Sequence, residues 1–277
     1  MQPCDRTDVP AISMEDALSA QQRGVFAPSA NAFDREDEGA DPEYYAATRL
    51  HHHMDPAARY ALRLYYEDTF EKMAAPAILE LCASWASHLP ELRDFGPTIG
   101  VGLNADELSR NGSLTAYVVH DLNAAPAVPG VVEAALAARE ECGDGAGDGG
   151  GDSECPFDFV TCVLGVEYLT QPVAVLSEAL RVLRPGGACI MAFTGRASLA
   201  TKVVRVWAEA SQAQRLWLAA AYLRSSRATD SSGTAWMFDG VEIVDLSPDP
   251  GRTDSLYIVR ATKSRASATA AEGASPT

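Results

Sequence analysis

Glu80 lies near the end of one apolar run, residues 77–82, and Asp121 directly follows another, residues 116–120; both runs are of the kind that forms a buried strand. In open α/β sheets the carboxyl ends of parallel strands meet at one edge, and ligands bind there. Carboxylates at that edge can accept hydrogen bonds from an ammonium or an amino group. The spacing therefore predicts that Glu80 and Asp121 face opposite ends of one ligand. The alternative role for either acid is to cap a helix or to anchor a loop.

A glycine pattern lies in the second apolar run. Gly100, Gly102 and Ala105 satisfy the G-x-G-x-x-A spacing of dinucleotide-binding proteins. That fingerprint needs a full strand before its first glycine, whereas the Phe-Gly-Pro sequence at 95–97 leaves only two strand residues upstream. The context therefore argues against a dinucleotide site at these residues.

Three consecutive histidines, His51, His52 and His53, precede a helix that is predicted to begin at Asp55 with Pro56 in its first turn. As metal ligands they lack a paired carboxylate or a fourth ligand at suitable spacing. Solvated or packed histidines are therefore favoured over a metal site. His53 stands as a candidate base, because this segment can close over a cleft.

The elements that must position these residues alternate along the chain. Seven apolar runs are predicted to be strands: 77–82, 98–103, 116–120, 159–164, 188–193, 241–246 and 256–261. The alternation through the first five predicts an α/β fold with a doubly wound, mostly parallel sheet. Only a loop separates the last two, which predicts a C-terminal antiparallel hairpin. A helix behind Pro172 and a turn at 184–187 link the fourth strand to the fifth.

Composition divides the chain into one folded region and three low-complexity segments. Residues 1–43 mix Ala, Ser, Pro and acids without a period, which predicts a disordered acidic tail. A stretch rich in Gly and Asp at 143–154 predicts a flexible insertion, and 264–277 predicts a second disordered tail. One domain, residues 44–263, is left to carry the chemistry.

The charge balance and the cysteines limit the classes of function. Lys and Arg total 22 against 38 acids, a formal net charge of −16, which repels nucleic-acid phosphates and anionic lipid. The chain lacks both a run of eighteen apolar residues and a basic-then-apolar leader, so a cytoplasmic protein without a membrane span is expected. The six cysteines form no C-x-x-C pair, which favours reduced thiols over disulfides or a zinc site.

Seven segments, taken in order, resemble a known family. They are YYAATRLHHHMD, LELCASWASHLP, VGLNADEL, YVVHDLNA, VEYLTQPVAVLSEALRVLRPGG, TKVVRVW and DLSPDPGRTDSLYIV. Together they resemble class I S-adenosylmethionine-dependent methyltransferases of type 11, and among these a group from plants, algae and bacteria with a CSSW-like first loop. The resemblance implies a Rossmann-like methyltransferase fold and S-adenosyl-L-methionine as the cofactor.

The first loop departs from the pattern of the wider family. That family carries an acid followed by G-x-G-x-G, because glycine lets the backbone approach the cofactor. Here Glu80 holds the acidic position, while Cys82, Ser84 and Ala86 stand at the glycine positions. These small side chains permit close approach where the backbone needs no positive φ. Trp85, in the same loop, either stacks on a ligand or packs in the interior.

The resemblance implies nine cofactor contacts. Gly102 takes the place of the usual ribose-binding acid, with Asn104 as the nearest polar substitute. Asn104 can instead be a helix N-cap, with Glu107 completing a capping box. Asp121 is expected at the adenine amino group, and Tyr168 at the rim between cofactor and substrate. The full set is Glu80, Cys82, Ser84, Gly102, Asn104, Asp121, Leu122, Leu164 and Tyr168.

Three hypotheses of function follow. The first is a methyltransferase that acts on a small molecule, with neither nucleic acid nor a membrane as partner. The second is a methyltransferase-like protein that binds the cofactor without turnover, and the third and weakest is a dinucleotide-dependent oxidoreductase. Methyl transfer from a sulfonium needs mainly proximity and alignment, so the sequence assigns no catalytic residue.

Overall fold

The computed structural model describes residues 29, 31–91, 94–141, 154–195 and 201–266. Its centre is one eight-stranded sheet in the order β3-β2-β1-β4-β5-β8-β7-β6. The strands are β1 Ile78–Leu81, β2 Thr98–Gly102, β3 Ala116–Val119, β4 Phe157–Val163, β5 Leu183–Thr194, β6 Arg227–Thr229, β7 Ala235–Asp245 and β8 Leu256–Arg265. The first five pair in parallel, whereas β8 lies antiparallel between β5 and β7. This arrangement confirms the predicted doubly wound sheet with antiparallel C-terminal strands.

The strand β6 is additional to the seven predicted strands. Its three residues pair antiparallel with the start of β7 at the outer edge of the sheet. A strand of three residues is too short to show an alternating pattern, so periodicity in the sequence cannot reveal it.

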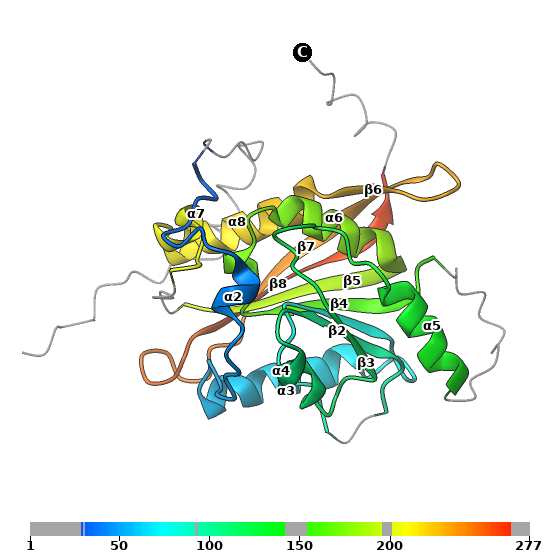
Figure 1. Ribbon diagram of the computed structural model, residues 1–277, viewed down its shortest axis with the longest axis horizontal. Coiled ribbons are helices and arrows are strands. Elements are labelled where there is room, and N and C mark those ends of the chain that lie inside the picture. The colour runs from blue at the N-terminus through cyan, green and yellow to red at the C-terminus, as the bar shows by residue number, and fades with distance from the viewer. Residues whose placement is uncertain (1–28, 30, 92–93, 142–153, 196–200, 267–277) are drawn as a thin grey trace, which may run out of the picture.

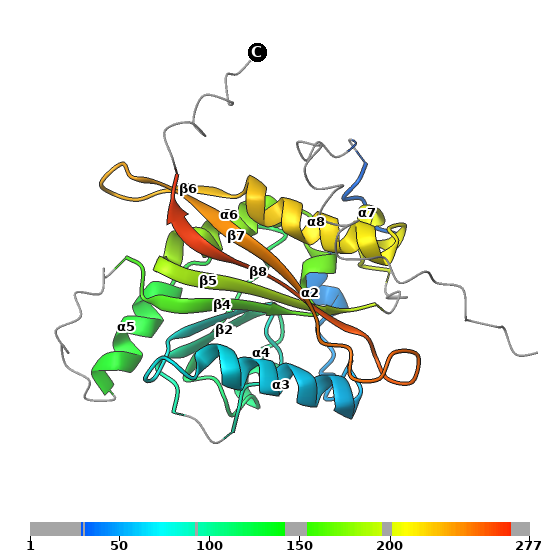
Figure 2. The same cartoon turned by 180° about the vertical axis from the view of Figure 1, so that it is seen from behind.

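Helices cover both faces of the sheet (Figures 1 and 2). One face of the sheet packs against three helices, α5 Val131–Glu141, α6 Pro172–Val182 and α8 Gln212–Ser225. The other face packs against one long helix, α3 Pro56–Phe70. The shorter elements are α2 Asp41–Tyr44, α4 Ala105–Ser109, the 3-10 helix η1 Val166–Tyr168 and α7 Arg205–Ala208.

The helix α3 begins where the sequence predicts. The Asp55 side chain accepts a hydrogen bond of 2.8 Å from the backbone N–H of Ala58, and Pro56 is the first helical residue. Tyr66 and Phe70 are fully buried on the sheet side of the helix. Capping and amphipathic packing together account for this helix.

The Arg-Pro-Gly-Gly segment at 184–187 forms a bulge inside β5 in place of the predicted turn before the strand. β5 pairs with β4 at Leu183 and again from Ala188, so the residues between leave the ladder. Gly186 has a φ of 80°, a left-handed conformation that glycine adopts without a Cβ clash. Helix α6 therefore passes directly into β5.

Packing begins before Tyr44, where order was predicted to start. The N–H of Asp37 donates to the carbonyl of Thr201 at 3.0 Å, and the N–H of Arg205 donates to the carbonyl of Asp34 at 2.8 Å. Residues 31–43 are therefore held against a distant part of the chain. Of the expected tails at 1–43 and 264–277, residues 1–28 and 267–277 lie outside the described residues, as does nearly all of the expected insertion at 143–154. The second tail was predicted to start too early, because β8 continues to Arg265.

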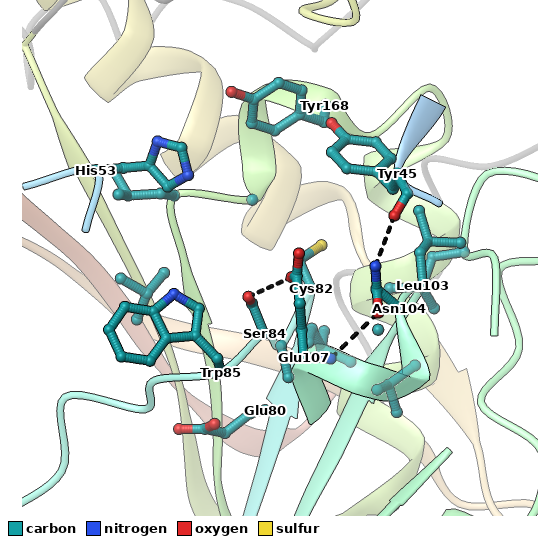
Figure 3. Close-up of a pocket in the computed structure, with 18 of the residues that line it drawn as sticks. Tyr45, His53, Glu80, Cys82, Ser84, Trp85, Leu103, Asn104, Glu107 and Tyr168 are labelled. Carbon is teal, nitrogen blue, oxygen red and sulfur yellow. Dashed lines mark hydrogen bonds between the residues drawn. The ribbon is translucent and has the colours of Figure 1, made fainter. Parts of the chain in front are cut away.

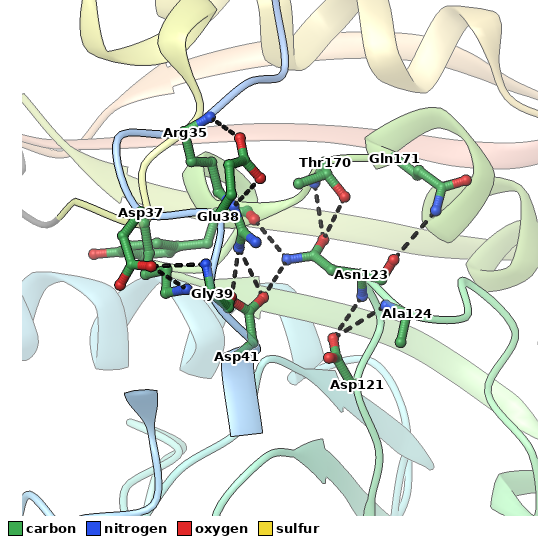
Figure 4. A network of polar contacts seen from close by, with 12 residues as sticks. Arg35, Asp37, Glu38, Gly39, Asp41, Asp121, Asn123, Ala124, Thr170 and Gln171 are labelled. Atoms are coloured by element: carbon green, nitrogen blue, oxygen red, sulfur yellow. Dashed lines mark hydrogen bonds and ion pairs between the residues drawn. The ribbon is translucent and has the colours of Figure 1, made fainter. Parts of the chain in front are cut away.

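A buried polar cluster fixes this N-terminal segment (Figure 4). Asp41 is 4% exposed and accepts hydrogen bonds from Arg35 Nη1 at 2.7 and 2.8 Å and from Asn123 Nδ2 at 2.8 Å. Lys202 Nζ, also buried, lies 3.3 Å from Asp41 Oδ1 and 3.2 Å from Asp37 Oδ1. We call these five residues the N-terminal clasp. Two acids and two bases balance its charge, so no buried charge is left unpaired.

Two properties of the described residues bear on the sequence predictions. None of the described helices is long and apolar enough to cross a bilayer. Cys82, Cys155, Cys162 and Cys189 are free thiols, and the remaining two cysteines lie outside the described residues.

Candidate functional site

A cavity of about 450 Å³ lies at the carboxyl ends of the parallel strands (Figure 3). Its volume is within the range of small-molecule sites, about 300 to 1,000 Å³. The residues predicted to contact the cofactor all line it: Glu80, Cys82, Ser84, Gly102, Asn104, Asp121, Leu122, Leu164 and Tyr168. The structure thus brings together residues that are spread over 89 positions of the sequence. Their contacts with a ligand remain predictions.

Glu80 is the acid at the end of β1. Its side chain is 5% exposed, and its Oε2 accepts a hydrogen bond of 2.6 Å from Ser87 Oγ. Burial raises the pKa of the Glu80 carboxyl to about 7, although the bond from Ser87 opposes this shift. Asn111 Nδ2 in turn donates a hydrogen bond of 2.9 Å to Ser87 Oγ. The protein therefore holds one oxygen of a carboxyl that is desolvated at the cavity.

The first loop has the backbone shape of a glycine loop without the glycines. Cys82 has a φ of 55°, the left-handed conformation that glycine usually supplies. A Cβ on Gly102 would stand 2.2 Å from the carbonyl oxygen of Ala83, so the loop lies directly against the end of β2. The N–H of Ala83 also donates to the carbonyl of Val101 at 2.7 Å. The condition that the backbone needs no positive φ is therefore not met at Cys82, which adopts the left-handed conformation as a residue other than glycine.

Gly165 allows the loop after β4 to approach Cys82. A Cβ on Gly165 would stand 2.5 Å from Cys82 Cβ and 3.0 Å from Cys162 Sγ. Such separations are too short for any larger residue at position 165 without movement of the backbone. Leu164 next to it has a φ of 52°, so both loops at this edge contain a strained residue other than glycine.

Asn104 is a helix N-cap, as one of its two predicted roles requires. Its Oδ1 accepts from the N–H groups of Asp106 and Glu107 at 3.0 and 3.1 Å, and its Nδ2 donates to the carbonyl of Tyr45 at 2.9 Å. Its side chain is therefore engaged at both ends by the protein. The rest of the capping box is not formed, because Glu107 accepts instead from Ser84 Oγ at 2.6 Å and from the N–H of Arg49 at 2.8 Å.

Asp121 turns the chain after β3. Its Oδ1 accepts hydrogen bonds from the N–H groups of Asn123 at 2.9 Å and Ala124 at 3.2 Å (Figure 4). The loop-anchor role is therefore present in the structure, and it occupies one of the two carboxylate oxygens. His120, the residue before it, contacts the carbonyl of Ala125 through Nε2 at 2.8 Å, which fits a packed histidine better than a base.

Tyr45 and Tyr168 form an aromatic side of the cavity opposite Glu80 in Figure 3. The η1 turn fixes Tyr168, whose carbonyl accepts from Asn123 Nδ2 at 2.9 Å. Burial raises the pKa of Tyr45, and the nearby Tyr168 adds to the shift, so the Tyr45 hydroxyl stays protonated. Sequence reasoning missed Tyr45, because it comes from a segment before the first strand that has no strand or helix period.

Glu167 is a second buried carboxyl that sequence reasoning gave no role. It is 7% exposed, lines the cavity, and its Oε2 has no hydrogen-bond partner among the residues that the structure describes. Burial raises the pKa of the Glu167 carboxyl to about 7, although a hydrogen bond from its own backbone N–H and the Arg215 guanidinium oppose the shift. Its position three residues after the predicted strand at 159–164 is the signal that could have identified it, since Glu80 and Asp121 were found by the same rule.

The histidines cluster at one side of the cavity. The His51 and His53 rings lie 4.4 Å apart, and the His52 ring lies 4.6 Å from Trp85. Burial and the neighbouring His51 lower the pKa of His53, so it is neutral at pH 7 and can accept a proton. Among the residues that the structure describes, no group of three or more His, Cys, Asp or Glu side chains has the geometry to hold a metal ion.

Comparison with known proteins relates part of the chain to one family. Residues 96–191 match the family described as a methyltransferase domain. Phosphoethanolamine N-methyltransferase 1 of Haemonchus contortus, solved with phosphoethanolamine and S-adenosylhomocysteine, superposes with a TM-score of 0.50 at 12% identity. The alignment covers 95% of this chain and 50% of that protein, so the chain spans half the length of this relative. An S-adenosylmethionine-dependent methyltransferase of Mesorhizobium loti has a TM-score of 0.43 at 12% identity, over 73% of this chain and 97% of that one.

The chain therefore has the Rossmann-like methyltransferase fold, and residues 96–191, less than half of the chain, match the methyltransferase-domain family. No curated protein sequence matches the chain. The comparisons do not support the narrower group of plant, algal and bacterial proteins.

Proposed function

We propose that this protein is an S-adenosylmethionine-dependent methyltransferase that acts on a small molecule. The observation that carries the proposal is Glu80, a buried carboxyl at the end of β1 that lines the cavity and has one oxygen fixed by Ser87. A desolvated carboxylate in this place favours a cationic group of a ligand. The methionine ammonium of the cofactor is such a group.

The residues present fit this cofactor. The left-handed Cys82 and the close approach of Gly102 to Ala83 reproduce the tight first loop. The side chains that replace the glycines of this loop line the cavity and do not fill it. Asp121 and Leu122, at the end of β3, would hold the adenine, and Glu80 the ammonium. The cofactor supplies an electrophilic methyl group on a sulfonium.

The chain itself contributes positioning and exclusion of water. The N-terminal clasp holds α2 and Tyr45 over the strand ends, which keeps solvent out of one side of the cavity. His53, neutral at pH 7, can accept a proton at its unprotonated ring nitrogen when the acceptor must lose one. The main source of rate enhancement is that the residues lining the cavity hold the acceptor next to the methyl group.

Calorimetric titration of the purified protein with S-adenosylmethionine, S-adenosylhomocysteine and NAD tests the proposal. The first two bind and NAD does not, because the glycine pattern at Gly100 is part of β2 and not of a dinucleotide loop. Glu80→Gln weakens S-adenosylhomocysteine binding by about 1 to 3 kcal/mol, while Glu178→Gln, which alters an acid paired with Arg181 outside the cavity, has no effect. Comparable binding of NAD, or unchanged affinity in Glu80→Gln, would contradict the assignment.

The second candidate is a protein that binds the cofactor without turnover. It is favoured by the loop in which Cys82, Ser84 and Ala86 replace glycine, since an altered loop can retain binding and lose the alignment needed for transfer. Incubation with labelled S-adenosylmethionine and a small-molecule extract separates the two. Release of S-adenosylhomocysteine that depends on the extract identifies an enzyme, and binding without release identifies the second candidate.

A further inference from the structure

The described residues that line the cavity include more acids than lysines and arginines. Five acids line it, namely Asp41, Glu80, Glu107, Asp121 and Glu167. Among the described lining residues, Arg49 alone is a lysine or arginine, and it is exposed. Its guanidinium donates to the carbonyl of Tyr44 at 3.1 Å and lies over the Tyr44 ring at 4.9 Å. The cavity therefore favours ligands that carry positive charge.

Four of these acids already have protein partners. Asp41 belongs to the N-terminal clasp, and Glu107 accepts from Ser84 and from the N–H of Arg49. Asp121 anchors its own loop, and Glu80 accepts from Ser87. If the proposed function is correct, Glu80 and Asp121 are also taken by the cofactor. Only Glu167 is then left for the second substrate.

Glu167 is fixed in place, and its Oε2 has no hydrogen-bond partner within the described part of the chain. Its carbonyl accepts from the N–H of Val204 at 3.0 Å, and the next residue, Tyr168, donates its N–H to the carbonyl of Gly165 at 3.1 Å. The turn therefore cannot carry the carboxyl out to solvent. A buried polar atom without a partner costs free energy, and a ligand that donates a hydrogen bond to it recovers that cost.

We propose that Glu167 binds the amino group of the methyl acceptor, and that the acceptor is an amine with an apolar or aromatic body. This inference rests on the proposed function. The body would lie against Tyr45, Tyr168 and Trp85, which line the same cavity (Figure 3). Aromatic faces attract both apolar groups and cations. A carboxylate or phosphate in the place of the amine is rejected, because it would meet the buried Glu167, while Arg215, the base that acts on Glu167, does not line the cavity and Arg49 is exposed at its surface.

Three small molecules that share a phenyl ring and differ in charge test this inference. Benzylamine, benzyl alcohol and benzoate are titrated into the protein at pH 8, with and without saturating S-adenosylhomocysteine. Benzylamine binds most tightly and benzoate most weakly, with at least about a tenfold difference in dissociation constant between them, which corresponds to about 1.4 kcal/mol. Equal affinities, or a preference for benzoate, would overturn the proposal.

The matched variants are Glu167→Gln and Glu178→Gln. Glu167→Gln keeps the size of the side chain and removes its charge, so the preference for benzylamine over benzyl alcohol falls about tenfold. Its S-adenosylhomocysteine affinity stays within about threefold, since Glu80 and not Glu167 is assigned to the cofactor. Glu178→Gln changes neither quantity. Retention of the benzylamine preference in Glu167→Gln would refute the role of Glu167, whereas loss of S-adenosylhomocysteine binding by the unaltered protein would refute the proposed function instead.

Discussion

Ser87 Oγ donates a hydrogen bond of 2.6 Å to Oε2 of Glu80, across the first loop that separates the two residues. The same hydroxyl contacts Asn111, which also donates to the carbonyl of Ser84 at 2.8 Å. Side-chain hydrogen bonds around the Glu80 carboxyl thus hold the two ends of the first loop together. These bonds fix the position of the loop, which glycine-rich loops achieve through backbone flexibility and close approach.

The stability of the ligand-free protein depends on pH through Glu80 and Glu167. Burial raises the folded-state pKa of each from 4.5 to about 7. Between about pH 4.5 and 7 these two carboxyls retain protons that the unfolded chain releases, so their contribution makes the free energy of unfolding fall as pH rises. Each carboxyl accounts for at most about 3.4 kcal/mol. Burial lowers the pKa of His88 from 6.5 to about 4, which acts in the opposite sense in the same range. The difference in free energy of unfolding between the unaltered protein and the double variant Glu80→Gln, Glu167→Gln, measured with denaturant from pH 5 to pH 8, isolates the carboxyl contribution; a difference that stays constant with pH contradicts this origin.

Asp121 has two separable roles. Asp121→Ala removes the acceptor for the N–H groups of Asn123 and Ala124, so the free energy of unfolding falls by about 1 to 2 kcal/mol. Asp121→Asn keeps an acceptor oxygen and removes the charge, so stability changes little while S-adenosylhomocysteine affinity falls by about 1 kcal/mol. Melting temperature and dissociation constant are measured on the same samples. Full affinity in Asp121→Asn would leave the loop anchor as its sole role.

Gly102→Ala disrupts the first loop. The added Cβ would stand 2.2 Å from the backbone oxygen of Ala83, which no side-chain rotation relieves. We expect a loss of about 2 kcal/mol or more of stability and weaker cofactor binding, because the loop must move. Gly112→Ala is the control, since its Cβ meets nothing within 4 Å, and it stays within about 0.5 kcal/mol. The melting temperatures of the two variants are compared by thermal unfolding. Equal melting temperatures would show that the first loop moves to accommodate the added Cβ without loss of stability.

Asp41→Asn breaks the N-terminal clasp. The variant leaves Arg35 and Lys202 buried beside a neutral side chain, so we expect a loss of about 3 kcal/mol in the free energy of unfolding. Glu43→Gln, an exposed change in the same short helix, is the control and costs less than about 0.5 kcal/mol. Urea unfolding compares the two. Similar midpoints would mean that solvent reaches the clasp and screens its charges.

Much of the fold follows from patterns local in sequence. Apolar runs and the Asp55 cap predict β1 to β5 and α3, because burial and capping are properties of neighbouring residues. The acids Glu80 and Asp121 are predicted at the cavity for the same reason, since strand ends can be read from the runs.

What the sequence does not predict depends on partners that are distant in the chain. Residues 31–43 have no period, and they are ordered by Lys202 and Asn123. Glu107 has a capping-box spacing, but its carboxylate accepts hydrogen bonds from Ser84 and from the backbone N–H of Arg49 instead. The left-handed φ of Cys82 likewise requires the surrounding loops, because cysteine has no local preference for it.

The N-terminal clasp also sets the order in which the cavity can be completed during synthesis. Lys202 Nζ donates to the carbonyl of Gly39, a contact that spans 163 residues. The ribosome synthesises Asp41 before the five strands β1 to β5 and before Lys202. The segment that contains Asp41 therefore lacks its partner Lys202 until all five strands have been made. The sheet edge is therefore open in the nascent chain, and the wall that Tyr45 provides is added among the last steps of folding.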